Sequence, residues 1–127
     1  MEKDFDAWNE RKKQINENQP IFYHEREIHW CSFGVNIGFE QDGKGNKYRR
    51  PALVIKGFSR YACLVVSLTT SQKKNIYYVG IGMINGKENF AIISQIRLID
   101  TRRLHTRLAV LDKEKFDVIR KAIRDLI

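Results

Sequence analysis

The sequence predicts a mainly β domain, either a small antiparallel barrel or a sandwich, with a helix at each end. From Ile28 onward, short runs of β-branched and aromatic residues alternate with polar turns that contain glycine. Five or so short strands at this spacing are typical of small barrels and sandwiches. The chain has 127 residues, enough to bury one core and too few for two ordinary domains.

The first segment is charged and compatible with a helix. In residues 4–18, Phe5, Trp8 and Ile15 fall along one face at the 3.6-residue period of a helix. Gln19-Pro20 ends this helix, because proline disfavours helical backbone at the residue before it. The narrow apolar face favours a packing or shielding role over a membrane or partner helix.

The composition predicts a set of short strands. They are Glu27–Phe33, Ala52–Gly57, Tyr61–Ser67, Ile76–Ile81 and Phe90–Ser94, with a further piece at Ile96–Leu98. Asn85-Gly86 lies between two apolar runs and predicts a hairpin, because both residues tolerate a positive φ.

A second helix is expected at the end of the chain. Asp112 can cap its N-terminus. The apolar stripe that follows predicts a face packed on the core, and its members are Phe116, Ile119, Ala122, Ile123 and Leu126.

The chain is basic, with 23 Lys and Arg against 15 Asp and Glu, a formal net charge of +8 and a pI near 9.7. This balance favours phosphate-rich partners, with nucleic acid first and an acidic protein second. The N-terminus lacks the apolar region of a signal peptide, and no apolar stretch is long enough to span a membrane. We therefore expect a soluble, cytoplasmic protein.

Several kinds of chemistry lack their sequence signatures. His24, His29 and His105 are scattered without metal-ligand spacing, so we expect no metal and no cofactor. A histidine in such a strand is more often packed or at the surface than a general base, and His29 is interpreted in this way. Cys31 and Cys63 lie in apolar segments and are interpreted as buried free thiols, with a disulfide or a nucleophile as the minority case. P-loop and GxSxG motifs are also missing.

A cationic rim is the main candidate for chemistry. One loop carries Lys44 and Lys47 and ends at Arg49-Arg50-Pro51, directly before an apolar strand. A second polar loop, Thr69–Lys74, follows another strand. Two such loops could converge on a phosphate, which a guanidinium grips with two parallel hydrogen bonds. The alternative is a pair of ordinary solvated turns.

Four motifs in register resemble a known family. They are Gly38-Phe39-Glu40-Gln41, the segment from Arg50-Pro51 to Ile55, Leu68-Thr69-Thr70-Ser71-Gln72, and the segment from Ser94-Gln95 to Asp100. Together with the closing helix they resemble the MazF/PemK toxins of bacterial toxin–antitoxin systems over about Glu27 to Leu126. The resemblance implies an SH3-like β-barrel of the CcdB/MazF type and a homodimer. It also implies a metal-independent endoribonuclease that cuts single-stranded RNA and is neutralised by a cognate antitoxin. The toxin domain would be residues 26–127, and residues 1–25 an added helical extension.

The resemblance places the family's catalytic arginine on Arg50 and its catalytic threonine on Thr69. In the family, the ribose 2′-OH attacks the adjacent phosphorus and leaves a 2′,3′-cyclic phosphate and a 5′-OH. The PemK/Kid branch has other acid and base residues at the positions of Phe39, Ile92 and Ser94, so the MazF arrangement applies. Glu40 is then the nearest candidate base, or else it orients the loop.

The loops also supply expected RNA contacts. The Lys44–Tyr48 segment is an insertion relative to the family, in which Tyr48 could stack on a base while the lysines follow the backbone. The full set comprises Gln41, Lys44, Lys47, Tyr48, Arg49, Thr70, Ser71, Gln72 and Lys73.

Two other functions fit the same sequence. The first is a non-enzymatic toxin on this fold that acts as CcdB acts on DNA gyrase, since a fold does not fix a function. The second is a basic RNA-binding module without activity, whose affinity for RNA would fall with salt.

Overall fold

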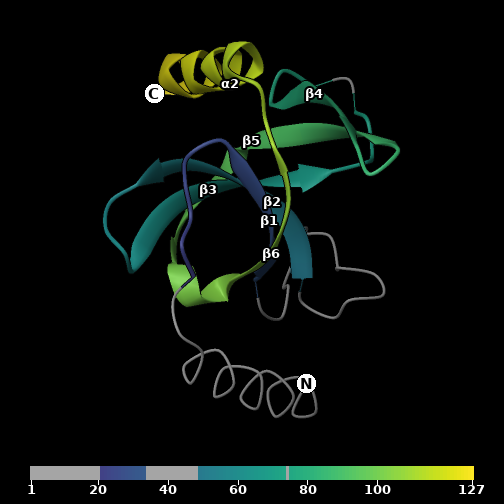
Figure 1. Ribbon diagram of the computed structural model, residues 1–127. Helices are drawn as coiled ribbons and strands as arrows, with labels where there is room; N and C mark the ends of the chain where they lie inside the picture. Colours follow the sequence, from purple (N-terminus) through teal and green to yellow (C-terminus); the bar gives the residue numbers. More distant parts are fainter. Residues whose placement is uncertain (1–20, 34–48, 74) are drawn as a thin grey trace, which may run out of the picture.

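The computed structural model describes residues 21–33, 49–73 and 75–127, which form one antiparallel sheet and a C-terminal helix (Figure 1). The strands are β1 (Glu27–Ser32), β2 (Arg49–Gly57), β3 (Ala62–Thr69), β4 (Tyr78–Ile84), β5 (Lys87–Asp100) and β6 (Leu104–Val110). A 3₁₀ turn, η1 (Thr101–Arg103), joins β5 to β6, and helix α2 covers Lys113–Leu126. The predicted helix in residues 4–18 lies outside the described residues.

The sheet has the strand order β4-β5-β3-β2-β1-β6. Figure 1 shows it curling strongly, with β6 returning beside β1. The two end strands, β4 and β6, are not paired with each other in the described part of the chain. The expected barrel is therefore found as a curved sheet that backbone hydrogen bonds do not close.

Side chains alternate between two cores, one on each face of the sheet. The larger core joins one face of the sheet to α2 and contains Ile28, Leu53, Val66, Leu68, Ala91, Ile93, Phe116, Ile119 and Ile123, among others. The smaller core lies on the other face and contains Cys31, Ala52, Val54, Cys63, Val65, Ile99 and Leu104. This alternation follows from the two-residue period of a strand.

The structure confirms the expected strands and corrects two details. The pieces Phe90–Ser94 and Ile96–Leu98 belong to one strand of 14 residues, β5. Its register against β3 jumps from Val66↔Ile96 to Leu68↔Ala91, so the polar residues Ser94 and Gln95 lie in a bulge within a continuous strand. The strand β6 was not expected.

The turn and the helix cap are as predicted. Asn85 and Gly86 have φ values of 51° and 78° and connect Ile84 to its partner Lys87. The Asp112 side chain accepts a hydrogen bond from the backbone N–H of Lys115, at 2.9 Å, and caps α2. Phe116, Ile119 and Ile123 are buried as expected, whereas Leu126 is exposed. No helix in the described ranges is both long enough and apolar enough to cross a membrane.

The residues before β1 tie it to its neighbours. The Arg26 backbone N–H donates to Val54 O at 3.0 Å, and the Arg26 side chain donates to Leu111 O at 2.9 Å. The Tyr23 hydroxyl donates to Ala62 O at 3.1 Å, and its ring lies so close to Gly57 that a Cβ there would collide with it. These contacts hold the end of β2 and the start of β3 beside the segment that leads into β1.

Candidate functional site

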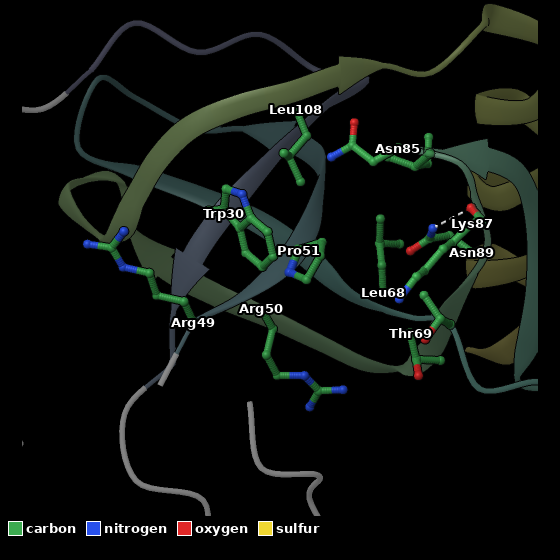
Figure 2. Close-up of a pocket in the computed structure, with 12 residues that line it drawn as sticks. Trp30, Arg49, Arg50, Pro51, Leu68, Thr69, Asn85, Lys87, Asn89 and Leu108 are labelled. Atoms are coloured by element: carbon green, nitrogen blue, oxygen red, sulfur yellow. Dashed lines mark hydrogen bonds between the residues drawn. The ribbon is translucent and has the colours of Figure 1, made fainter. Parts of the chain in front are cut away.

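A pocket of about 410 Å³ opens where β2 begins and β3 ends (Figure 2). It is lined by residues from all six strands of the described sheet, by the Asn85 turn and by Thr70 after β3. These residues are Trp30, Arg49, Arg50, Pro51, Leu68, Thr69, Thr70, Ile84, Asn85, Lys87, Asn89 and Leu108.

Arg50 and Thr69 come together at the edge of this pocket (Figure 2). Arg50 is the second residue of β2 and Thr69 is the last residue of β3. The two strands pair with Ala52 opposite Ser67, and the same register continued by two residues puts Arg50 opposite Thr69. Only 8% of Arg50 and 7% of Thr69 is exposed. Both side chains are therefore held in place by the surrounding structure.

The Thr69 hydroxyl has a fixed orientation. Its Oγ1 accepts a hydrogen bond from the backbone N–H of Ser71, at 3.1 Å. Because a hydroxyl can accept and donate at once, its own proton can still be given to an oxygen in the pocket. Thr69 therefore offers a donor directed beside a guanidinium.

The pocket floor is apolar and its rim is polar. Trp30 and Pro51 pair across β1 and β2, and Figure 2 shows them beside Leu108 and Leu68. At the opposite rim, Asn89 is only 4% exposed, and its amide nitrogen donates to Lys87 O at 2.9 Å. Such a floor can receive a flat apolar ring while the rim holds polar groups.

The electrostatic character of the pocket is positive. Its described lining includes Arg49, Arg50 and Lys87 and contains no carboxylate. Low-dielectric walls strengthen the attraction of such a pocket for an anion. The site is therefore suited to a phosphate group attached to an aromatic or other flat moiety.

The sequence-based candidates are placed as follows. Arg49, Arg50, Thr69 and Thr70 line the pocket. Ser71, Gln72 and Lys73 follow β3, are exposed and are not part of the lining. The remaining candidates lie outside the described residues, and they are Glu40, Gln41, Lys44, Lys47 and Tyr48.

Sequence reasoning missed much of the lining. Trp30, Leu108 and Asn89 come from strands that are distant in the chain, and their convergence depends on the curl of the sheet. Of these residues, Asn89 has a local signal in the sequence. It is the third residue after the Asn85-Gly86 turn, so the turn and the alternation of side chains along a strand fix the face on which it lies.

The histidines lie in a separate cluster between β1 and β6. His29 is buried, with its Nε2 2.9 Å from the Glu27 carboxylate and its Nδ1 2.9 Å from the backbone oxygen of His105. Glu27 also binds His24 and Arg107. Burial raises the pKa of Glu27, but hydrogen bonds from His29, His24 and Arg107 outweigh it and lower the pKa to about 2. This cluster joins two strands and is not part of the pocket lining.

Both cysteines are buried and free, as expected. Burial, followed by the proximity of Cys63, raises the pKa of the Cys31 thiol to about 12. Burial and the charge of Asp100 raise the pKa of Cys63 to about 12 as well. Neither side chain supplies a thiolate nucleophile at neutral pH. Within the described ranges, no group of three or more His, Cys, Asp or Glu side chains is arranged to hold a metal ion.

The sequence model of the PemK-like, MazF-like toxins of type II toxin–antitoxin systems matches residues 24–127. The chain belongs to this family. A comparison with curated proteins finds no match.

Solved structures share the MazF fold with this family member. MazF from Deinococcus radiodurans is 22% identical, with a TM-score of 0.64 over 84% of this chain and 96% of that chain. An endoribonuclease from a mycobacterial species, solved with its cognate antitoxin, is 15% identical, with a TM-score of 0.61 over 82% and 93% of the two chains. The MazE–MazF complex of Deinococcus radiodurans gives 19% identity and a TM-score of 0.60 over 84% and 95%.

Proposed function

We propose that the chain is a toxin that cuts single-stranded mRNA without a metal ion. The ribose 2′-OH attacks the adjacent phosphorus, and the products carry a 2′,3′-cyclic phosphate and a 5′-OH. The observation that carries the proposal is the opposed, buried pair Arg50 and Thr69 at the edge of a cationic pocket, in a chain of this family.

Arg50 supplies the charge that the transition state needs. As the 2′ oxygen adds to phosphorus, negative charge grows on the two non-bridging oxygens, and the planar guanidinium can bond both of them. A buried donor that is already in position is worth more there than in water. The guanidinium keeps its charge at any pH that RNA tolerates, so it acts by stabilising charge.

Thr69 completes the phosphate grip. Its hydroxyl proton points to a phosphate oxygen or to the 2′-OH, while the Ser71 amide fixes its rotamer. The proton of the attacking 2′-OH must pass to a base, for which Glu40 is proposed. The departing 5′ oxygen takes up a proton from water and ends as the 5′-OH.

The rest of the pocket holds the nucleotide beside the scissile bond. Trp30 and Pro51 offer a flat apolar surface on which a base can stack. Arg49, Thr70 and Lys87 stand at the rim and can bond the neighbouring backbone. The further RNA contacts proposed along the strand are Gln41, Lys44, Lys47, Tyr48, Ser71, Gln72 and Lys73.

A cognate antitoxin and a second copy of the chain complete the proposal. The mycobacterial endoribonuclease was solved in complex with its cognate antitoxin, and Deinococcus radiodurans MazF was solved together with MazE. An antitoxin tail with acidic and apolar side chains could fold over the cationic pocket and gain both charge pairing and buried area. Family resemblance supports the homodimer, and action on mRNA places the protein in the cytoplasm.

The test is cleavage of a long RNA by the purified protein in EDTA. The products should accept a radioactive phosphate from polynucleotide kinase without prior phosphatase treatment, because they carry 5′-OH ends. An absence of fragments at every salt concentration would defeat the proposal. Binding to gyrase without RNA cleavage would favour the non-enzymatic toxin, and salt-dependent RNA binding without products would favour the inactive binding module.

A further inference from the structure

A second pocket, of about 340 Å³, shares no lining residue with the first and takes no part in the proposed chemistry. It is formed by the end of β1, the end of β5 and η1, and its lining includes Ser32, Phe33, Arg97, Asp100 and Arg103. Ser32 pairs across the strands with Arg49, which lines the first pocket. Paired residues in antiparallel strands have Cα atoms about 5 Å apart, so the linings of the two pockets meet at this pair.

The second pocket carries an excess of positive charge. Among the described residues that line it, Asp100 is the only acid. Its Oδ1 accepts from the Arg102 backbone N–H at 2.8 Å and from Arg102 Nε at 3.0 Å, and its Oδ2 accepts from Arg102 Nη2 at 2.7 Å. Arg102 therefore neutralises this carboxylate, and Arg97 and Arg103 keep a net charge in the pocket.

Both guanidiniums are held by the fold. The Arg97 guanidinium lies over the Phe33 ring, 5.0 Å from its centroid. Arg103 Nη1 donates to the backbone oxygen of Ser32 at 3.3 Å. Neither residue is fully exposed, so each loses less rotamer freedom than a surface arginine when it binds a ligand.

The proximity of these two cations is unfavourable in the absence of an anion. Burial lowers the pKa of Arg103 below its ordinary value, and the like charge of Arg97 lowers it further, against the opposing effects of Cys31 and Asp100. An anion placed between the two guanidiniums would relieve the repulsion and restore part of the lost solvation.

We propose that the second pocket binds a backbone phosphate of the same RNA strand whose scissile phosphate lies at Arg50. Resting on the proposed function, this inference makes Arg97 and Arg103 positioning residues. They fix the strand on one side of the cut and make no contact with the reacting phosphate. Their contribution is made equally in the ground state and the transition state, so it affects KM and leaves kcat unchanged.

The test measures binding of mixed-sequence single-stranded RNA across a salt series. Arg97→Gln should weaken binding and lower the slope of log K against log[salt] by about 0.7, the value for one lost phosphate contact on a single strand. In cleavage assays, it should raise KM several-fold at constant kcat. Arg103→Gln should do the same, and Arg97→Lys, which keeps the charge, should recover most of the affinity and the slope.

Arg60→Gln is the matched control. Arg60 also lies over an aromatic ring, that of Tyr61 at 5.7 Å, but it belongs to neither pocket. An unchanged salt slope in both Gln variants would overturn the inference, and so would a fall in kcat at constant KM. A loss of thermal stability shared by Arg97→Gln and Arg97→Lys would assign a structural role instead. If the wild type binds RNA but does not cut it, the slopes still decide whether the phosphate site exists.

Discussion

Arg50 and Thr69 stand opposite each other across β2 and β3, two residues beyond the paired residues Ala52 and Ser67. Both are polar, both are more than nine-tenths buried, and both line one pocket. Side by side, a guanidinium and a hydroxyl can donate hydrogen bonds to the same phosphate. The pair is therefore the structural centre of the proposed catalysis.

The Thr69 hydroxyl can be tested by an isosteric change. Thr69→Val keeps the shape of the side chain and removes the donor, so kcat should fall roughly 10- to 150-fold, the range for a hydrogen bond of about 1.5–3 kcal/mol to a charged group. Thr69→Ser keeps the hydroxyl and should retain most of the activity. Single-turnover cleavage measures both. A Val variant as fast as the wild type would remove Thr69 from the mechanism.

The Glu27 cluster predicts a loss of stability in acid. The folded-state pKa of Glu27 is lowered to about 2 from an ordinary value of 4.5, so its contribution is present above about pH 4.5 and is lost as the pH falls toward 2. In denaturant titrations, Glu27→Gln should lower the free energy of unfolding at pH 7 by up to ~3 kcal/mol. This difference should shrink steadily as the pH is lowered.

The exposed Glu88 provides the control for that experiment. Glu88→Gln should change the free energy of unfolding at pH 7 by no more than about 0.5 kcal/mol, as is usual at the surface. If the penalty of Glu27→Gln stayed constant between pH 7 and pH 3, its carboxylate would not be the stabilising species.

The turn between β4 and β5 predicts a difference between two glycines. Gly86 has a φ of 78° and open space around its Cα, so Gly86→Ala should lower the free energy of unfolding by about 1–2 kcal/mol through backbone strain alone. Gly80 lies in β4 without a positive φ, and a Cβ there would make only ordinary contacts with Phe90, so Gly80→Ala should be neutral or slightly stabilising. Equal effects from the two substitutions would contradict the positive φ.

Local patterns in the sequence were enough to predict the strands, the Asn85 turn and the Asp112 cap. Each of these depends on neighbouring residues, such as the alternation of apolar side chains or a backbone that needs a positive φ. The strand β6 escaped prediction because Leu104 is its only fully buried residue, so it lacks the apolar run of a central strand. The continuity of β5 was missed because its bulge places two polar residues within the strand.

Local sequence patterns also predicted part of the site. Arg50 and Thr69 each lie at a strand end, and family motifs mark them. The floor formed by Trp30, Pro51 and Leu108, and the buried Asn89 at the rim, depend on how the sheet curls. That curl is a property of the whole fold, and no local pattern encodes it.

The most direct measurement is the chemistry of the RNA ends produced by the wild type, Arg50→Ala and Arg60→Ala in EDTA. The wild type and Arg60→Ala should give matching 2′,3′-cyclic phosphate and 5′-OH ends. Arg50→Ala should yield them at least ~100-fold more slowly, as for a lost transition-state donor. Undiminished cleavage by Arg50→Ala, or products with 5′-phosphate ends, would contradict the proposed mechanism.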